Sequence, residues 1–425
     1  MELDTARTLA STEGRAMLAA LPPYSPATAE HMNARLRAHG MAPDLASAAL
    51  TQLALRAEAA DRLGPVADLL LLTRAGLEQA TRTVVAAHHA HRFRRASVTR
   101  VADLGCGLGL DSLAIAGLGT GVVAVEQDPV TAAFARANLE PFDGAEVREA
   151  DALDVDLTDL GADALWADPA RRDAAGRRLT EPESWSPPLA DVVARARSVR
   201  AAGIKVAPGI ELDRIPDDAH AQWVSVDREV VEAALWFGDA APEGAGRSAL
   251  VLLGEEPHLL APEGGGPLPP SAPHDDAPVA PLGAFLHEPD GAVIRAGLVA
   301  DLARLLGAGV VSPRIAYLTS DAPAASPFAR SYRILEQVDA GAKGLARAVA
   351  AREIGDLTIK QRGSGVKVED VRRRLRLRGP NRATLVLTRA EGRHVALLVE
   401  PVPETSVEPV DATSVEPTHE HGDKG

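Results

Sequence analysis

The sequence predicts an α/β protein in which a doubly wound domain of seven strands stands between a helical N-terminal region and a small α+β module. Three observations lead to this fold class. Apolar residues recur at helical spacing near the N-terminus, short apolar runs alternate with helical stretches in the middle of the chain, and paired strand-like runs follow a glycine turn near the C-terminus. The 425 residues are enough for two or three domains.

The first predicted domain is a helical region over residues 1–96. Residues 48–63 and 77–93 carry apolar side chains at three- and four-residue steps, and Gly64-Pro65 separates the two stretches as a break. We therefore expect one helix on each side of this break.

The second predicted domain spans residues 97–255, where apolar runs of strand length alternate with helical stretches. This alternation is typical of a doubly wound parallel sheet. The expected helices are Asp111–Gly117, Pro129–Asn138 and Pro188–Ser198. The expected strands are Arg100–Leu104, Gly121–Val125, Ala145–Glu149, Ala162–Ala167, Gly203–Val206, Trp223–Val230 and Ser248–Leu253.

The rest of the chain predicts a linker, a module and a tail. Residues 256–280 are rich in proline and glycine, which is typical of a linker or long loop. A small α+β module follows over 281–401, and the polar, repetitive residues 402–425 predict a disordered tail. Within the module we expect a strand Asp356–Gln361, a turn Arg362–Gly365, a helix Lys367–Leu375, and a strand pair Ala383–Thr388 and His394–Val399 joined by a turn at Arg389–Gly392.

Composition excludes several classes of protein. The longest apolar runs are too short to span a membrane, so we expect no membrane partner. The first residues are acidic rather than apolar, and the single cysteine, Cys106, cannot form an internal disulfide, so we expect a cytoplasmic protein. The net charge of −14 argues against a uniform coating of nucleic acid.

The most informative motif is Val-Ala-Asp-Leu-Gly-Cys-Gly-Leu-Gly at residues 101–109. Alternating Gly105, Gly107 and Gly109 after a strand let the backbone approach a nucleotide closely. A dinucleotide-binding turn has its last glycine one residue later, and its pyrophosphate would avoid a carboxylate such as Asp103. The pattern resembles the S-adenosylmethionine-binding turn of Rossmann-like methyltransferases, in which Asp103 would lie near the methionine end and favour its ammonium group.

Two more acidic residues follow at the ends of the next strands. Glu126 closes the second expected strand, seventeen residues after Gly109, and Asp151 follows the third. A carboxylate has enough lone pairs to accept hydrogen bonds from both hydroxyls of a ribose, so we assign this role to Glu126. We expect Asp151 to meet the adenine amino group, and S-adenosylmethionine to be the cofactor.

The fourth expected strand ends in Asp168-Pro169-Ala170-Arg171-Arg172. Asp-Pro-Pro-Tyr at this place is typical of enzymes that methylate amino groups of bases, but here alanine and arginine replace the second proline and the ring. We assign Asp168 as the catalytic residue that accepts a hydrogen bond or a proton from the methyl acceptor. Since the only cysteine lies inside the glycine turn, methylation of a pyrimidine at C5 through a cysteine is not expected.

We expect no metal ion. The cluster of His88, His89 and His91 is interpreted as a solvated helix face rather than a set of metal ligands.

Two basic clusters suggest an anionic substrate. The first is Arg171, Arg172, Arg177 and Arg178, which fits a phosphate backbone or, alternatively, a surface loop with salt bridges. The second holds eight cationic residues against two acidic residues between Leu357 and Arg378. Pro169, Arg171 and Arg172, and then Lys360, Arg362 and Lys367 around the glycine turn, are the candidate substrate- or phosphate-binding residues. The alternative for the second cluster is an amphipathic helix with a charged outer face.

Five segments resemble a bacterial family of class I methyltransferases with a C-terminal THUMP-like domain. They are Leu77–Thr81, Asp103–Gly109, Asp168–Arg172, His287–Asp290 and Leu357–Gly363. The resemblance covers about residues 50–400 and implies a Rossmann-like seven-stranded domain. Because THUMP domains recognise RNA, it also implies an RNA partner.

The leading hypothesis is therefore an S-adenosylmethionine-dependent methyltransferase that modifies RNA, such as tRNA or rRNA, at nitrogen or oxygen. Two alternatives stay open: a methyltransferase for an anionic small molecule or a protein, and a non-catalytic RNA-binding protein on a relic methyltransferase fold. The sequence does not indicate the oligomeric state.

Overall fold

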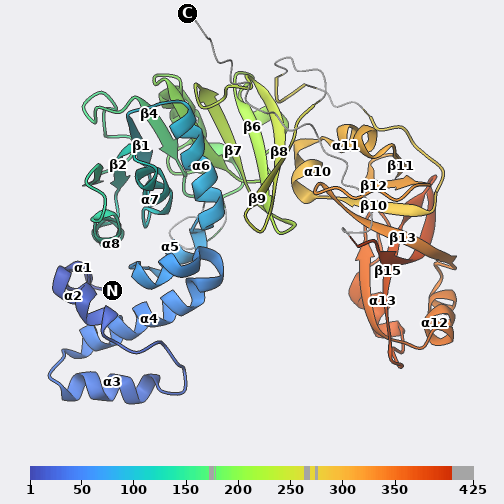
Figure 1. Cartoon of the computed structure of the whole chain (residues 1–425), viewed down its shortest axis with the longest axis horizontal. Helices are drawn as coiled ribbons and strands as arrows, with labels where there is room; N and C mark the ends of the chain where they lie inside the picture. Colours follow the sequence, from blue (N-terminus) through green and yellow to red (C-terminus); the bar gives the residue numbers. More distant parts are fainter. Residues whose placement is uncertain (172–176, 178, 263–268, 273–275, 404–425) are drawn as a thin grey trace, which may run out of the picture. The chain divides into compact units, whose positions relative to one another are not determined.

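The computed structural model describes residues 1–171, 177, 179–262, 269–272 and 276–403 (Figure 1). The chain divides into two compact units. The first holds residues 1–220 and 233–246, and the second holds residues 221–232 and the chain from Arg247 onward.

A sheet with the strand order β3-β2-β1-β4-β5-β7-β6-β8-β9 confirms the doubly wound α/β fold. Strand β1 pairs in parallel with β2 and β4, and the neighbours β3 and β5 continue the parallel part on either side. The direction of winding reverses between β1 and β4, and ligands of such sheets bind beyond the carboxyl ends of the strands at this point. The strands are β1 (Arg100–Leu104), β2 (Gly121–Glu126), β3 (Ala145–Glu149), β4 (Ala164–Ala167), β5 (Ala201–Val206), β6 (His220–Val226), β7 (Glu229–Gly238), β8 (Gly246–Leu253) and β9 (Glu256–Leu260).

The three expected helices of this domain are confirmed to within two residues. They are α7 (Leu110–Gly117), α8 (Pro129–Leu139) and α9 (Leu189–Ala196). The start of α8 is fixed locally, because Asp128 Oδ1 accepts a hydrogen bond of 2.8 Å from the N–H of Thr131 and Pro129 occupies the first turn.

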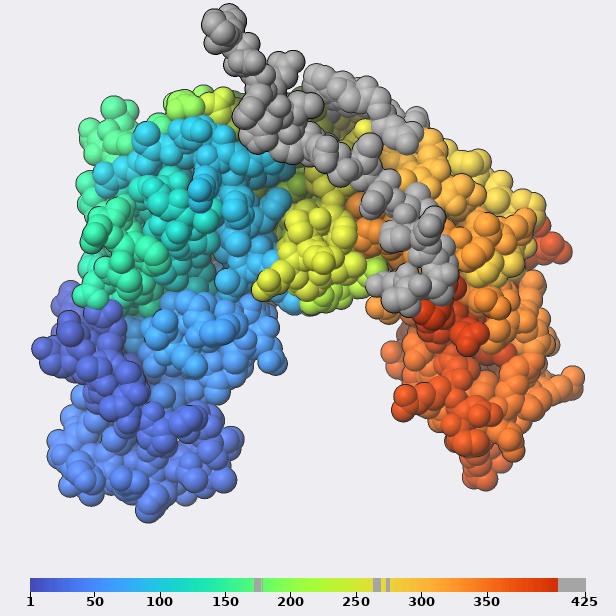
Figure 2. Space-filling view, viewed as in Figure 1, coloured from blue at the N-terminus to red at the C-terminus, as the bar shows by residue number. Residues whose placement is uncertain are grey.

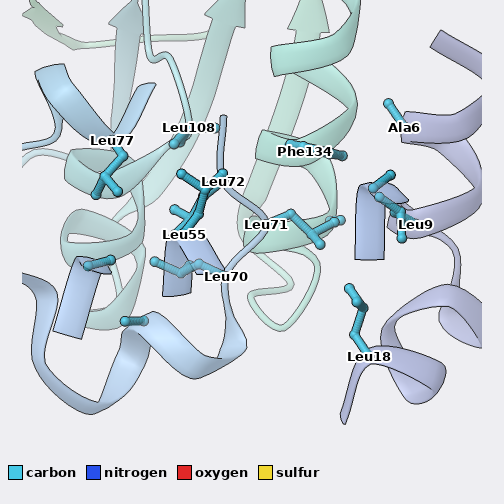
Figure 3. Close-up of a cluster of buried hydrophobic side chains, with 14 of the residues drawn as sticks. Ala6, Leu9, Leu18, Leu55, Leu70, Leu71, Leu72, Leu77, Leu108 and Phe134 are labelled. Atoms are coloured by element: carbon cyan, nitrogen blue, oxygen red, sulfur yellow. The ribbon is translucent and has the colours of Figure 1, made fainter. Parts of the chain in front are cut away.

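The N-terminal region is helical, as predicted, but it belongs to the same compact unit as the parallel strands. Its leucines share a core with Leu108 of the glycine turn and Phe134 of α8 (Figure 3). In the space-filling view its helices, in blue, lie directly against the teal part of this unit (Figure 2). The elements are α1 (Leu3–Ala10), α2 (Thr12–Ala19), α3 (Ala29–Ala38), α4 (Pro43–Leu63), the 3-10 helix η1 (Gly64–Leu69), α5 (Arg74–Gln79) and α6 (Thr83–Arg95).

The single helix expected over residues 77–93 is wrong. Helix α5 ends at Gln79 and α6 begins at Thr83, and the residues between them are not helical. The physical reason is a tertiary one: the Thr81 side chain is buried and hydrogen-bonded to residues far away in the sequence. Helical periodicity cannot reveal such a break.

The seven-strand prediction also missed a hairpin. The run Trp223–Val230 was expected to be one strand, but β6 ends at Val226 and β7 begins at Glu229. The turn residues Asp227 and Arg228 have φ angles of 48° and 74°, so the chain reverses there without a glycine to mark the turn. This hairpin adds one strand to the seven expected, and β9 adds another, so the sheet has nine strands.

The predicted linker 256–280 begins with a strand. Residues 256–260 form β9, which pairs antiparallel with β8. This strand contains Pro257, which is tolerated because β9 is the last strand in the order and therefore an edge strand. Most of the proline- and glycine-rich stretch that follows lies outside the described residues.

The second unit contains a sheet with the order β11-β12-β10-β13-β16-β15-β14, in which only the β14–β15 pair is parallel. The expected strand, helix and strand pair near its end are confirmed, and the turn of the hairpin is Glu391-Gly392, with φ angles of 48° and 79°. The elements are β10 (Phe285–Pro289), α10 (Gly291–Ala296), α11 (Val299–Leu306), β11 (Gly309–Ser312), β12 (Ile315–Ser320), β13 (Ala329–Val338), α12 (Ala342–Ala351), β14 (Ile354–Gln361), α13 (Val368–Arg374), β15 (Asn381–Ala390) and β16 (Arg393–Pro401).

Two further expectations concern the tail and a membrane-spanning helix. Of the predicted tail, residues 404–425 lie outside the described residues. Within the described ranges, no helix combines the length and apolar character needed to cross a membrane.

Candidate active site

The glycine turn lies directly after β1 and bends back onto the end of β2. Gly105, Gly107 and Gly109 have φ angles of 80°, 55° and 79°, which side-chain-bearing residues rarely adopt. The N–H groups of Gly105 and Cys106 donate hydrogen bonds of 2.9 and 3.0 Å to the carbonyl of Val125. The three glycines are therefore required by the backbone conformation of the turn.

A cavity of about 260 Å³ opens beside this turn, at the carboxyl ends of β1, β2 and β4. Five of the predicted site residues line it: Gly105, Gly107, Glu126, Asp151 and Asp168. Gly109, Asp103, Pro169 and Arg171 do not line it. Other lining residues come from the N-terminal helical region, the glycine turn and the start of α7, among them Thr73, Gly76, Gln79, Thr81, Cys106 and Asp111.

Glu126 faces the cavity from the end of β2, where backbone donors hold its carboxylate. Gly107 N–H donates to Oε2 at 3.0 Å and Asp128 N–H donates to Oε1 at 2.8 Å. Burial raises the pKa of Glu126 above its ordinary value, whereas these two hydrogen bonds act to lower it. Because a carboxylate can accept about four hydrogen bonds, both oxygens can still accept from a ligand.

Asp103 lies beneath the glycine turn and not on the cavity wall. Its side chain is buried beneath the turn, and Oδ2 accepts a hydrogen bond of 2.5 Å from the Ser112 hydroxyl. Burial raises the pKa of Asp103 to about 8, and the charge of Asp111 adds to this effect. The Asp103 side chain thus supports the turn from below, while Asp111 is a carboxylate that lines the cavity, and an effect of Asp103 on the cofactor ammonium stays a prediction.

The helical region supplies one wall of the cavity, which the sequence analysis did not foresee. Residues 70–72 run extended past the glycine turn, and Asn138 of α8 joins the two. Its side-chain oxygen accepts from Leu71 N–H at 2.8 Å, and its NH₂ group donates to the carbonyls of Leu71 and Leu108 at 3.1 and 3.0 Å. Gly76, at the start of α5, is packed so closely that a Cβ atom would lie 2.6 Å from Leu108 Cδ1.

A chain of buried polar side chains leads from the cavity into the core. Lys205 Nζ, on β5, donates to Asp168 Oδ2 at 2.8 Å and to Thr81 Oγ1 at 3.0 Å. Thr81 donates in turn to Asp111 Oδ2 at 2.9 Å, and His89 Nδ1 lies 2.8 Å from Asp111 Oδ1. We refer to these five side chains as the polar chain.

The polar chain explains the electrostatics of Asp111. Burial by itself would raise the pKa of this carboxyl, but the hydrogen bond and charge of His89 and the charge of Lys205 prevail and lower it. The sequence analysis missed Lys205, although a lysine within the apolar run Ala-Ala-Gly-Ile-Lys-Val was a visible signal.

The interpretation of the histidine cluster as a solvated face is wrong for His89. This side chain is fully buried, and its ring lies 4.2 Å from that of Trp166, which in turn stacks on Trp236 at 5.5 Å. Gly203 leaves room for the two indoles, because a Cβ atom there would lie 2.5 Å from Trp236. No group of histidine, cysteine and acidic residues suited to a metal ion occurs among the described residues.

Backbone hydrogen bonds hold the segment that follows β4, which contains the residues predicted to contact the methyl acceptor. Ala170 N–H donates to the Ser186 carbonyl at 2.8 Å, and Ser186 N–H donates to the Ala170 carbonyl at 3.1 Å. Asp168 precedes this contact, and its side chain is 27% exposed. Arg172 and Arg178 of the first basic cluster lie outside the described residues.

The second basic cluster lies in the second unit and is only partly available to a ligand. Lys360 Nζ donates to Glu288 Oε2 at 2.6 Å, so its charge already has an acidic partner, and its contact with a phosphate stays a prediction. The Arg362 guanidinium lies 5.3 Å from the centre of the Tyr317 ring. Lys367 is exposed and lines a cavity of about 610 Å³ together with Ser364, Gly365, Arg374 and His394.

Comparison with known proteins decides the family. Two proteins from two strains of Mycobacterium tuberculosis are each 34% identical to this chain over 345 residues, covering 79% of this chain and 90% of the relative. Each is named an uncharacterized S-adenosylmethionine-dependent methyltransferase. This chain belongs to that methyltransferase family. The predicted enzyme class and its cofactor, S-adenosylmethionine, are thereby confirmed.

Two further comparisons concern the fold of this chain and its N- and C-terminal regions. A solved structure from Porphyromonas gingivalis W83, named as a methyltransferase, has a TM-score of 0.68 at 20% identity and covers 90% of this chain and 100% of that one. Residues 329–401 match the family described as THUMP domain-like, within the module predicted at 281–401. Residues 2–59 match a domain family of unknown function.

Proposed function

We propose that this methyltransferase modifies RNA, such as tRNA or rRNA, at a nitrogen or an oxygen atom. The observation that carries the proposal is a THUMP domain-like region in the same chain as a methyltransferase site, with eight cationic and two acidic residues between Leu357 and Arg378. The resemblance to THUMP domains favours an RNA partner over other anionic substrates.

The cofactor residues follow from the cavity. We assign Gly105 and Gly107 to the backbone that approaches the cofactor, Glu126 to the ribose hydroxyls and Asp151 to the adenine, because all four residues line the cavity. The glycine turn supports this assignment, since its left-handed backbone leaves no Cβ atoms between the strand end and a ligand. Bound S-adenosylmethionine supplies an activated methyl group.

The chain's own residues must then hold the acceptor atom near that methyl group and take up one proton. Asp168 is the residue that we assign to this role, because its carboxylate lines the cavity at the end of β4. The exposed cations near Lys367 would hold the phosphates of the RNA.

The test is transfer of a labelled methyl group from S-adenosylmethionine into cell extracts that lack the enzyme. Total RNA, protein and small molecules are separated and counted after incubation with the wild type, Asp168→Asn and the control Asp143→Asn, which changes an exposed carboxylate remote from the cavity. We expect label in RNA with the wild type and the control, and a loss of at least about 100-fold with Asp168→Asn. Label that enters only protein or small molecules would contradict the RNA proposal.

A second candidate, methylation of an anionic small molecule or a protein, is favoured by one observation. Arg171 stands where an aromatic ring would stack on a base, and aromatic residues make up 3% of the chain. The same fractionation separates the two candidates.

A further inference from the structure

Lys205 of the polar chain has an unusual position for a lysine. Its side chain is 6% exposed, on a strand whose other residues are apolar or glycine, yet Nζ reaches the carboxylate of Asp168 on the cavity wall. Desolvation of an ammonium group is expensive, and a buried ion pair is often no more stabilising than apolar residues of similar size. Stability alone is therefore a weak reason for this pair.

The directions of the hydrogen bonds show how Lys205 fixes one oxygen of Asp168. The Thr81 hydroxyl has a single proton, which it donates to Asp111, so it can only accept from Lys205. The ammonium group is thus held on one side by Thr81 and on the other by Asp168 Oδ2. Asp168 receives a fixed partner on one of its two oxygens.

We propose that Lys205 is a positioning residue for methyl transfer, which holds Oδ2 of Asp168 and thereby directs Oδ1 toward the methyl acceptor. The proposal rests on the proposed function in one respect, namely that Asp168 accepts a hydrogen bond or a proton from the acceptor. Thr81, Asp111 and His89 extend the support of the ammonium group into the core.

Lys205 is the cationic partner of Asp168 Oδ2 in acidic surroundings. Asp103 on β1 interacts electrostatically with Asp168, and Asp111 on α7 interacts with Lys205 and with His89 of α6. Removal of the ammonium group would leave Asp168 Oδ2 without the partner that fixes it.

The test compares kcat for labelled methyl transfer between pH 6 and 9 in the wild type, Lys205→Met and Lys205→Arg. Lys343→Met, which changes an exposed lysine on α12, is the matched control. We expect Lys205→Met to lower kcat at least about tenfold across this pH range, because Asp168 Oδ2 loses the partner that fixes it. Lys205→Arg should recover part of kcat, and calorimetry should find the affinity for S-adenosylmethionine changed by less than about threefold.

Thr81→Val serves as a second variant if Lys205→Met does not fold. It removes one anchor of the ammonium group but keeps the ion pair, so a smaller loss of kcat is expected. An unchanged kcat and pH profile in a folded Lys205 or Thr81 variant would overturn the proposal.

The fraction of the extract that receives the label distinguishes a failure of this proposal from a failure of the proposed function. If the wild type labels protein or small molecules, RNA is the wrong acceptor, and the same comparison in that fraction still decides on Lys205. If Asp168→Asn stays fully active, Asp168 has no acceptor role and the positioning role of Lys205 fails with it.

Discussion

Glu126 is the single residue on which the assignment of the cofactor cavity depends most. Replacement by alanine removes the acceptors assigned to the ribose and leaves the N–H of Gly107 without its carboxylate partner. We predict that Glu126→Ala weakens S-adenosylmethionine binding by about 1–3 kcal/mol in calorimetry. Glu149→Ala, which removes an exposed carboxylate at the end of β3, is the control and should bind normally. Unchanged affinity of Glu126→Ala would remove the ribose role.

Asp103 should make stability depend on pH. Because burial raises its pKa to about 8, the folded state favours the protonated carboxyl, and the stability associated with that proton is lost as the pH rises from about 4 to about 8. Asp103→Asn cannot ionise and should lose less stability over this range. Thermal melts of both proteins at several pH values measure the difference, and parallel curves would show that Asp103 is not protonated in the folded state.

At the scale of elements, the join between residues 70–72 and the glycine turn depends on Asn138. Asn138→Ala would leave buried N–H and carbonyl groups of Leu71, and the carbonyl of Leu108, without their partner. We predict a loss of about 1–3 kcal/mol in the free energy of unfolding, measured with urea. Asn33→Ala on α3, which lies outside this contact, should unfold near the wild-type midpoint. Equal midpoints for all three proteins would show that this join contributes no stability.

Sequence patterns predicted the strands that are uniformly buried. They failed where contacts between distant residues, or a turn without glycine, determine where an element ends. The parallel strands were found because strands buried on both faces read as continuous apolar runs, as Val122–Val125 does. The break after Gln79 depends on contacts of Thr81 with α7 and β5, and the β6–β7 turn uses left-handed Asp227 and Arg228 without glycine. Neither feature leaves a local signature in the sequence.

The same limit applies to the site. Glu126, Asp151 and Asp168 could be named because strand ends gather at one edge of a parallel sheet. Lys205 gave only the signal of a charge within an apolar run, and its role, like that of Asp111, arises from hydrogen bonds between distant elements. The burial of Asp103 could not be predicted, because a motif gives the order of residues but not which side chain lies beneath the turn.

At the scale of the whole molecule, RNA binding should depend on salt. We predict that Lys367→Ala with Arg374→Ala lowers affinity for total tRNA and reduces the slope of log affinity against log salt by about 0.7 for each phosphate that the protein no longer neutralises. Filter binding at several salt concentrations measures both. Arg35→Ala with Arg37→Ala on α3 is the control of equal charge change. An affinity that is independent of salt in the wild type would exclude phosphate docking.

The most direct test of RNA methylation by this enzyme is mass spectrometry of nucleosides from cells that lack the gene. We predict that one methylated nucleoside disappears from tRNA or rRNA, returns when the wild type is restored, and stays absent when Asp168→Asn is supplied instead. A complete set of methylated nucleosides in the cells without the enzyme would contradict the account.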